Sequence, residues 1–228
     1  CLRFAVGEVS VFSEFNKEGF LRTVFQVVYK NKPGPDACGA VGTVSFTVEC
    51  MVHHKGSAKI ASPAIKVLMA LCTSNLDNCA RLVEPTNIGH LSSILDDFKG
   101  APKIFSTFCQ VLTIVAKSSL ANRNTLSQSN LYVTLVDMAI NPEGTKESVV
   151  AAVGCVPYFV PLTQEALVEN LIQMMTVYAE DESKKELCVA ATLGIEVVKA
   201  RKEGREDLSK VGKKKKDKKK KKNEGGEE

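Results

Sequence analysis

The sequence has no tryptophan, only three histidines, and no apolar stretch long enough to cross a membrane. Its longest apolar run covers residues 149–162, whereas a membrane helix needs about 20 apolar residues. Because the run also contains Pro157 and Pro161, we expect it to belong to a protein core. No basic-then-apolar leader is visible after Cys1, and we interpret the chain as a fragment that continued upstream.

Few side chains suit catalysis or metal binding. Cys50, His53 and His54 form a Cys-x-x-His-His cluster. A structural zinc site needs about four ligands, and no second Cys/His pair supplies the remainder. No glycine pattern that cradles a phosphate occurs. Cys72 and Cys155 lie in apolar runs, where a thiol is a poor nucleophile. We therefore expect no enzymatic activity, no cofactor and no metal site.

The eight cysteines are scattered along the chain and lack the dense spacing of a small secreted domain held by disulfides. Buried free thiols in a reducing compartment are the simplest interpretation. This predicts a cytoplasmic protein, with the nucleus as the alternative location.

Positive charge is concentrated at the end of the chain. Residues 213–228 hold nine lysines against four carboxylates, a balance of +5, so residues 1–212 carry −1 of the total of +4. Lysines at this density cannot form a core, and we expect residues 204–228 to be a disordered tail. Its lysines are Lys213, Lys214, Lys215, Lys216, Lys218, Lys219, Lys220, Lys221 and Lys222.

Four roles are open for this tail. It would simply keep the protein soluble, or attract the phosphate backbone of a nucleic acid. Alternatively, it would contact an acidic protein surface such as the tails of tubulin, or act as a nuclear import signal. It contains no aromatic residue, so base stacking is not expected.

A shift of 44 residues brings two parts of the sequence into register. It aligns six identical pairs between residues 65 and 82 and their counterparts, including Leu68 with Leu112 and Asn78 with Asn122. A period near 44 falls in the range of about 40–47 residues that stacked helical repeats use.

Apolar periodicity defines the helices of these repeats. Ile65, Leu68, Met69 and Cys72 follow the i, i+3, i+4, i+7 spacing of one helix face. Two clear repeats are predicted at 62–98 and 103–141, with helices at 60–73, 76–84, 88–98, 103–117, 120–128 and 130–140. A third repeat is predicted at 145–181, with helices at 145–160 and 163–179, and a capping helix follows at 183–202.

Residues 1–58 match the repeat less well. We expect helices at 4–16, 19–31 and 36–54. The Val, Phe and Thr enrichment of 41–52 would also suit a strand, but a lone strand would lack a partner.

The repeat pattern resembles that of the armadillo family. In the family, apolar positions about ten and seven residues before an Asn are followed by an apolar residue four after it and then by an Ile–Leu set. The first repeat fills these places with Leu68, Leu71, Asn78, Leu82, Asn87, Ile88, Leu91, Ile94 and Leu95. The second uses Leu112, Val115, Asn122, Leu126, Asn130, Leu131 and Leu135.

The resemblance implies an all-α fold, a right-handed α-solenoid of armadillo/HEAT-like repeats over residues 1–203 followed by the tail. It implies a non-enzymatic scaffold that binds a partner peptide or helix on its concave face. We expect the third helix of each repeat to line that face. The residues then exposed there are His90, Ser92, Ser93, Asp97, Tyr132, Thr134, Asp137 and Asn141, a polar set without a dominant charge.

Nuclear-import adaptors with this fold hold basic peptides on ladders of Trp and Asn. The absence of Trp argues against that binding mode. Asn78 and Asn122 occupy a ladder-like place, although hydrogen bonds at helix ends would also explain them. The alternative function is a nucleic-acid-, ribosome- or cytoskeleton-associated factor anchored by the tail. The scaffold is favoured because no basic stripe is evident before residue 204.

Overall fold

The computed structural model describes residues 14–30, 34–140, 144–208 and 211, and every regular element among them is helical. The α-helices are α2 (Glu14–Lys30), α3 (Gly34–Ala40), α4 (Thr43–His53), α5 (Ala58–Cys72), α6 (Leu76–Leu82), α7 (Pro85–Asp97), α8 (Pro102–Ser118), α9 (Leu120–Gln128), α10 (Leu131–Ile140), α11 (Lys146–Cys155), α12 (Glu165–Glu180) and α13 (Lys185–Lys202). Two short 3₁₀ turns, η2 (Val156–Tyr158) and η3 (Glu182–Lys184), precede α12 and α13 respectively. The predicted all-α fold is confirmed.

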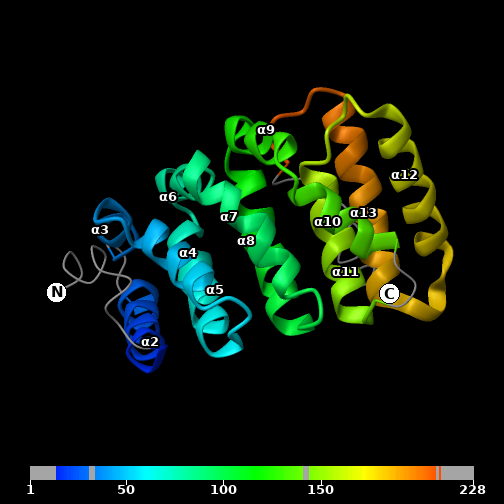
Figure 1. The fold of residues 1–228 in the computed structure, drawn as a ribbon. Helices are drawn as coiled ribbons and strands as arrows, with labels where there is room; N and C mark the ends of the chain where they lie inside the picture. Colours follow the sequence, from blue (N-terminus) through cyan, green and yellow to red (C-terminus); the bar gives the residue numbers. More distant parts are fainter. Residues whose placement is uncertain (1–13, 31–33, 141–143, 209–210, 212–228) are drawn as a thin grey trace, which may run out of the picture.

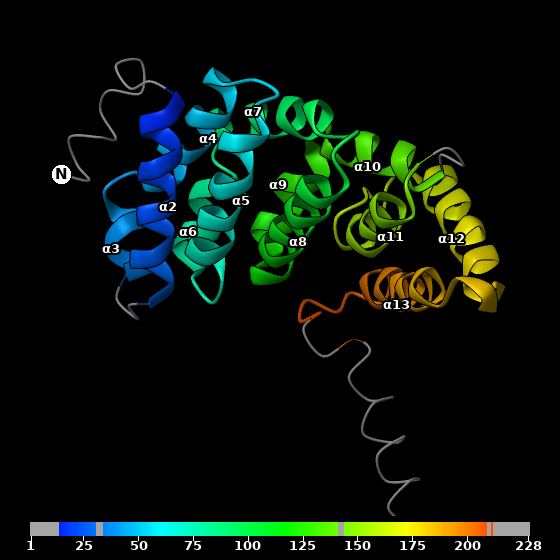
Figure 2. The same ribbon diagram turned by 90° about the horizontal axis from the view of Figure 1, so that it is seen from below.

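The helices stack into a curved arc (Figures 1 and 2). The inner row consists of α2, α5, α8, α11 and α13, each packed on the next. The outer row consists of α4, α7 and α10, which pack on one another along the opposite side. Figure 2 shows the inner row on the hollow side of the arc. The short helices α3, α6 and α9 connect the inner row to the outer row.

The inner row forms because its helices bury apolar side chains against their neighbours, as α8 shows. In α8, Phe105, Val111, Leu112 and Val115 are all at most 1% exposed. They pack between α5 on one side and α11 on the other. Burying each such side chain contributes about 1.5–3 kcal/mol. A single helix could not bury these side chains by itself, so each helix of the row is stabilised by the helices next to it.

The short helices α6 and α9 begin at equivalent positions, one 44-residue period apart. The Asn75 side chain accepts a hydrogen bond from the backbone N–H of Asn78 at 2.9 Å and so caps α6. The Ser119 hydroxyl caps α9 through the backbone N–H of Asn122 at 3.0 Å. Asn75 and Ser119 are 44 residues apart, which explains why the turns between long and short helices match.

The structure corrects several predicted boundaries. Residues 36–54 form two helices because Gly42 adopts a left-handed backbone (φ 85°) between α3 and α4. Most of residues 41–52 are helical, as expected, and do not form the strand that their composition would also suit, since they lie in α4. The helix predicted to reach residue 160 ends at Cys155, next to the 3₁₀ turn that contains Pro157. Most of the helix predicted at 4–16 lies outside the described residues.

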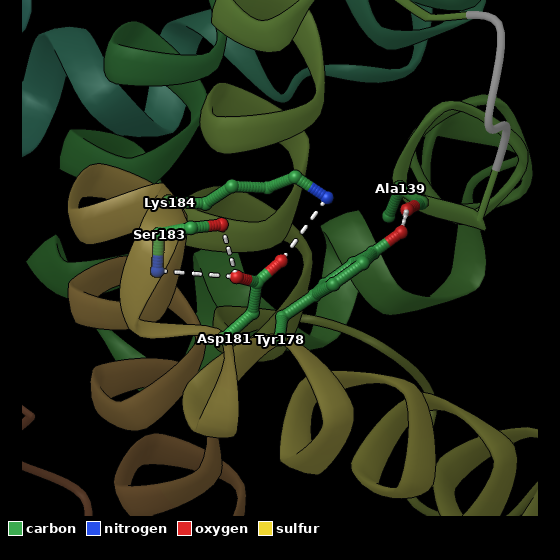
Figure 3. A network of polar contacts seen from close by, with 5 residues as sticks. All are labelled: Ala139, Tyr178, Asp181, Ser183 and Lys184. Atoms are coloured by element: carbon green, nitrogen blue, oxygen red, sulfur yellow. Dashed lines mark hydrogen bonds and ion pairs between the residues drawn. The ribbon is translucent and has the colours of Figure 1, made fainter.

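The last two helices, α12 and α13, pack on each other as a hairpin, and Figure 3 shows polar contacts near its turn. The Tyr178 hydroxyl of α12 donates to the carbonyl of Ala139 in α10 at 3.0 Å. At the turn, the Asp181 carboxylate accepts the backbone N–H of Ser183 (3.2 Å) and pairs with Lys184 Nζ (3.1 Å). Hydrogen bonds from Ser183 and Lys184 lower the pKa of Asp181. The hairpin lets α13 pack on α11 and continue the inner row.

The segment after α13 folds back onto the stack. Arg123 of α9 is 3% exposed, and its guanidinium donates to the carbonyl of Ala116 (3.2 Å) and to that of Glu206 (2.8 Å). Leu208 is buried in the common core. The predicted start of a disordered tail at residue 204 is therefore wrong for residues 204–208. The lysines at 213–222 lie outside the described residues.

A close contact ties α3 to α6. Asn78 is fully buried, and its side-chain amide donates to the carbonyls of Pro35 (2.9 Å) and Leu71 (3.0 Å). The Asn78 side-chain oxygen accepts a hydrogen bond from Arg81 at 2.8 Å. A Cβ atom at Gly39 would collide with that oxygen. Position 39 therefore requires glycine, because any side chain there would overlap the Asn78 amide.

Gly39→Ala should lower the free energy of unfolding by about 1–3 kcal/mol, because the new methyl group overlaps the Asn78 amide. In an Asn78→Ala background the same change should cost much less, since the colliding amide is gone. Urea unfolding of the four proteins measures the difference. Gly89→Ala, at a helical position with open space, is the control and should raise stability by about 0.5–1 kcal/mol. An equal cost in both backgrounds would contradict the contact.

Arg123→Met should lower the free energy of unfolding by about 1–3 kcal/mol, because the buried carbonyl of Ala116 and the carbonyl of Glu206 lose their donor. Amides of residues 205–208 should also exchange with solvent faster. The matched control is Arg205→Met, which removes an exposed ion pair with Glu203 and should change stability by less than about 1 kcal/mol. Unchanged exchange in the Arg123 variant would show that the segment is held by other contacts.

Candidate functional site

A groove of about 850 Å³ lies on the hollow side of the arc, between three helices of the inner row. Helix α8 contributes Ser106, Gln110 and Thr113. Helix α11 contributes Val150 and Gly154, and α13 contributes Leu193. The groove lining therefore combines hydroxyl, amide, charged and aliphatic side chains.

Gly154 gives the groove part of its width. An added Cβ at this position would meet no atom within 4 Å, so a side chain placed there would extend into open space. Ala151 and Ile114, both half-buried, lie beside it in the groove wall. This apolar part of the wall suits an aliphatic side chain of a bound segment.

Charged groups occupy the rim of the groove. Lys146 Nζ of α11 and Glu186 Oε2 of α13 are 2.9 Å apart. Lys117 Nζ lies 4.5 Å from the ring centre of Tyr158, a cation–π contact. Burial lowers the pKa of Lys117. Burial, with Cys155 nearby, raises the pKa of Tyr158 to about 12, so its phenol is neutral at physiological pH.

The surface residues predicted from the sequence lie on the other side of the arc. His90 and Ser93 are exposed on α7, and Asp137 is exposed on α10. Both helices belong to the outer row. The prediction that 88–98 and 130–140 line the concave face is therefore wrong. The inner face belongs instead to the first, long helix of each predicted repeat.

Other predicted residues are engaged within the fold. Asp97 pairs with Lys55 at 3.3 Å, and the Tyr132 hydroxyl accepts a hydrogen bond from Gln164 at 2.9 Å. Thr134 is 6% exposed and donates to Asp96 at 2.9 Å, which links α10 to α7. Burial alone would raise the pKa of Asp96, but hydrogen bonds from Lys99 and Thr134 lower it overall.

Asn78 and Asn122 are not available to a partner. Asn78 holds α6 against α3 and α5, and Asn122 is 5% exposed and donates to the Ser118 hydroxyl at 2.9 Å. Both residues instead form hydrogen bonds at helix ends, which was the alternative explanation suggested by the sequence. Ser92 is half-buried on α7, and Asn141 lies outside the described residues.

The groove residues escaped the sequence analysis although the repeat contains a signal for them. Lys59 and Ser62 of α5 are identical to Lys103 and Ser106 of α8 under the same 44-residue shift. Polar groups repeated on an otherwise apolar helix indicate an exposed face. The repeat matches most closely over residues 65–82, where the matched residues are mainly core positions, so the match there does not predict the groove.

Several other features bear on the chemistry of the site. Each described cysteine is a free thiol, and among these only Cys188 is not fully buried. No group of three or more His, Cys, Asp or Glu side chains able to hold a metal ion occurs in the described ranges. No helix of the described residues has the length and apolar character of a membrane span.

Comparisons with known proteins identify the fold. No family model and no curated protein matches the chain. A designed armadillo repeat protein in complex with the peptide (KR)4 superposes with a TM-score of 0.69 at 15% identity, over 85% of this chain and 80% of that one. A second designed armadillo repeat protein gives 0.52 at 12% identity, over 87% and 100%. The chain therefore has an armadillo-like repeat fold.

Proposed function

We propose that this protein is a non-enzymatic scaffold that binds an extended segment of a partner protein in the groove between α8, α11 and α13. The observation that carries the proposal is the groove itself, about 850 Å³ on the hollow side of the arc. Stacked repeats characteristically use such an extended concave surface for binding.

The spacing of the inner helices suits an extended chain. Neighbouring helices pack about 8–10 Å apart, and an extended chain advances about 3.3 Å per residue. A segment that crosses the inner row therefore meets a new helix about every three residues. Side chains that alternate along the segment would point in turn toward the groove wall and toward solvent.

The groove walls supply both kinds of contact that such a segment needs. Gln110 is exposed and has no hydrogen-bond partner within the described part of the chain, so its amide is available to peptide N–H and C=O groups. Val150 and Leu193 provide an apolar surface for an anchoring side chain. The designed neighbour of the same fold, which holds a peptide, supports this use of the fold.

The finer alternatives are less supported. An extended segment is favoured over a partner helix because the groove is continuous across three parallel-stacked helices. A role of the lysine tail in anchoring the protein to nucleic acid, ribosomes or the cytoskeleton stays a separate hypothesis, because the tail lies outside the described residues.

Gly154→Leu should abolish binding of groove ligands, because the new side chain fills open space inside the groove. Ligands are obtained by selecting peptides from a random library on the chain of residues 1–228, and their affinities are measured by fluorescence anisotropy. The matched control is Gly89→Leu on the outer helix α7, where open space also surrounds the glycine. Both variants exchange a helical glycine for leucine, so both should keep or gain stability. Selected peptides that bind the Gly154 variant as tightly as the parent protein would refute the proposal.

A further inference from the structure

Two neighbouring helices of the inner row carry positive charge and no negative charge. Helix α5 contains Lys59 and Lys66 and no Asp or Glu. Helix α8 contains Lys103 and Lys117 and again no Asp or Glu. All four lysines are exposed. Within the described part of the chain, none of them takes part in an ion pair.

The four lysines share one face. Lys103 and Lys117 follow the same helical stripe as Ser106 and Gln110, which line the groove. Lys59 is one 44-residue period before Lys103, and α5 packs directly on α8. With a rise of 1.5 Å per residue, the lysines span about 20 Å along the helices. We call these four residues the inner lysine face.

Two of the acidic groups on the neighbouring inner helices are already paired. On α2, Glu18 pairs with Arg22 at 2.8 Å. Glu186 of α13 pairs with Lys146. Glu147, at the start of α11, is the exposed carboxylate one period beyond Lys103 and marks the edge of the face. The expectation that the folded part of the chain has no basic stripe is therefore wrong.

From this charge distribution we infer that the partner segment is acidic, with carboxylates over the inner lysine face and an apolar side chain in the groove beside Val150 and Leu193. This inference rests on the proposed binding function and names the chemistry of the ligand. Unpaired lysines favour carboxylates by charge complementarity. Burial of the aliphatic anchor in the adjoining groove fixes the position of the segment.

The same charge excludes the chain's own tail as the occupant. The lysines at 213–222 form a basic peptide, and the designed neighbour of this fold holds a basic peptide, (KR)4. Here a basic peptide would meet four unpaired lysines and be repelled. Charge repulsion therefore disfavours a basic segment as the occupant and favours an acidic segment of a partner.

A protein segment is favoured over single-stranded nucleic acid. Binding of single strands depends strongly on exposed aromatic rings on which bases stack. The rings of α8, Phe105 and Phe108, are buried, and α5 contains no aromatic residue. The exposed ring elsewhere in the inner row, Tyr29 of α2, is stacked on Phe25 at 5.5 Å.

The test measures binding of a fluorescein-labelled peptide of alternating glutamate and serine, with one central leucine as the anchor, to the chain of residues 1–228. The triple variant K59Q/K66Q/K103Q should bind it about tenfold more weakly, since each exposed charge pair contributes modestly. The control K55Q/K99Q/K184Q removes the same charge from lysines that are each paired with an aspartate, and should change affinity less than about twofold. Added salt should weaken binding to the parent protein. A peptide of alternating lysine and arginine should not bind.

Three outcomes would overturn the inference. Equal loss in both triple variants would show that only net charge or the lysine tail attracts the peptide. Tight binding of the basic peptide would show that the groove has the opposite preference. An oligonucleotide that binds through the inner lysine face when the acidic peptide does not would assign the face to nucleic acid. In each case the Gly154→Leu test of the groove would stand or fall independently, because its ligands are selected without regard to charge.

Discussion

Each long helix of the inner row is stable because it is packed between two others, and the rest of the molecule depends on this contact. Helix α8 buries aromatic and aliphatic side chains against α5 and α11, and the same arrangement repeats along the arc. The shorter helices bring the chain back to the start of the next long helix, with Asn75 and Ser119 capping α6 and α9 at equivalent places. One face of every long helix is thereby left uncovered on the hollow side. The surface available for binding is a consequence of how the core is built.

The sequence was sufficient for the repeat and for most of the helices. Leucines and valines at helical spacing recur after 44 residues because each repeat must present the same core face to its neighbours. The orientation of the repeat could not be obtained in this way. Apolar periodicity distinguishes a buried face from an exposed one, but it does not show whether the exposed face lies inside or outside the arc. His90 and Asp137 were therefore assigned to the wrong side, although both are exposed.

Buried polar residues were the second feature that could not be predicted from the sequence. Asn78, Asn122 and Arg123 are polar by type but are buried, because backbone carbonyls at helix ends or hydroxyl groups nearby accept their hydrogens. A residue type does not reveal such partners, which come from segments as distant as Glu206. The positive charge of the inner surface could not be predicted for a related reason. Lys59 and Lys103 are far apart in the sequence, and only the stacking of α5 on α8 combines them.

The central claim is that the hollow side of the arc, and not the outer row, receives the partner. Site-specific photo-crosslinking tests it directly, with the crosslinking residue placed at Gln110 on α8 or, in a separate protein, at Ser93 on α7. Both positions are exposed on their helices, so neither substitution disturbs the core. With a peptide selected on the chain of residues 1–228, the account predicts a crosslink from Gln110 and none from Ser93. A crosslink from Ser93 without one from Gln110 would contradict it.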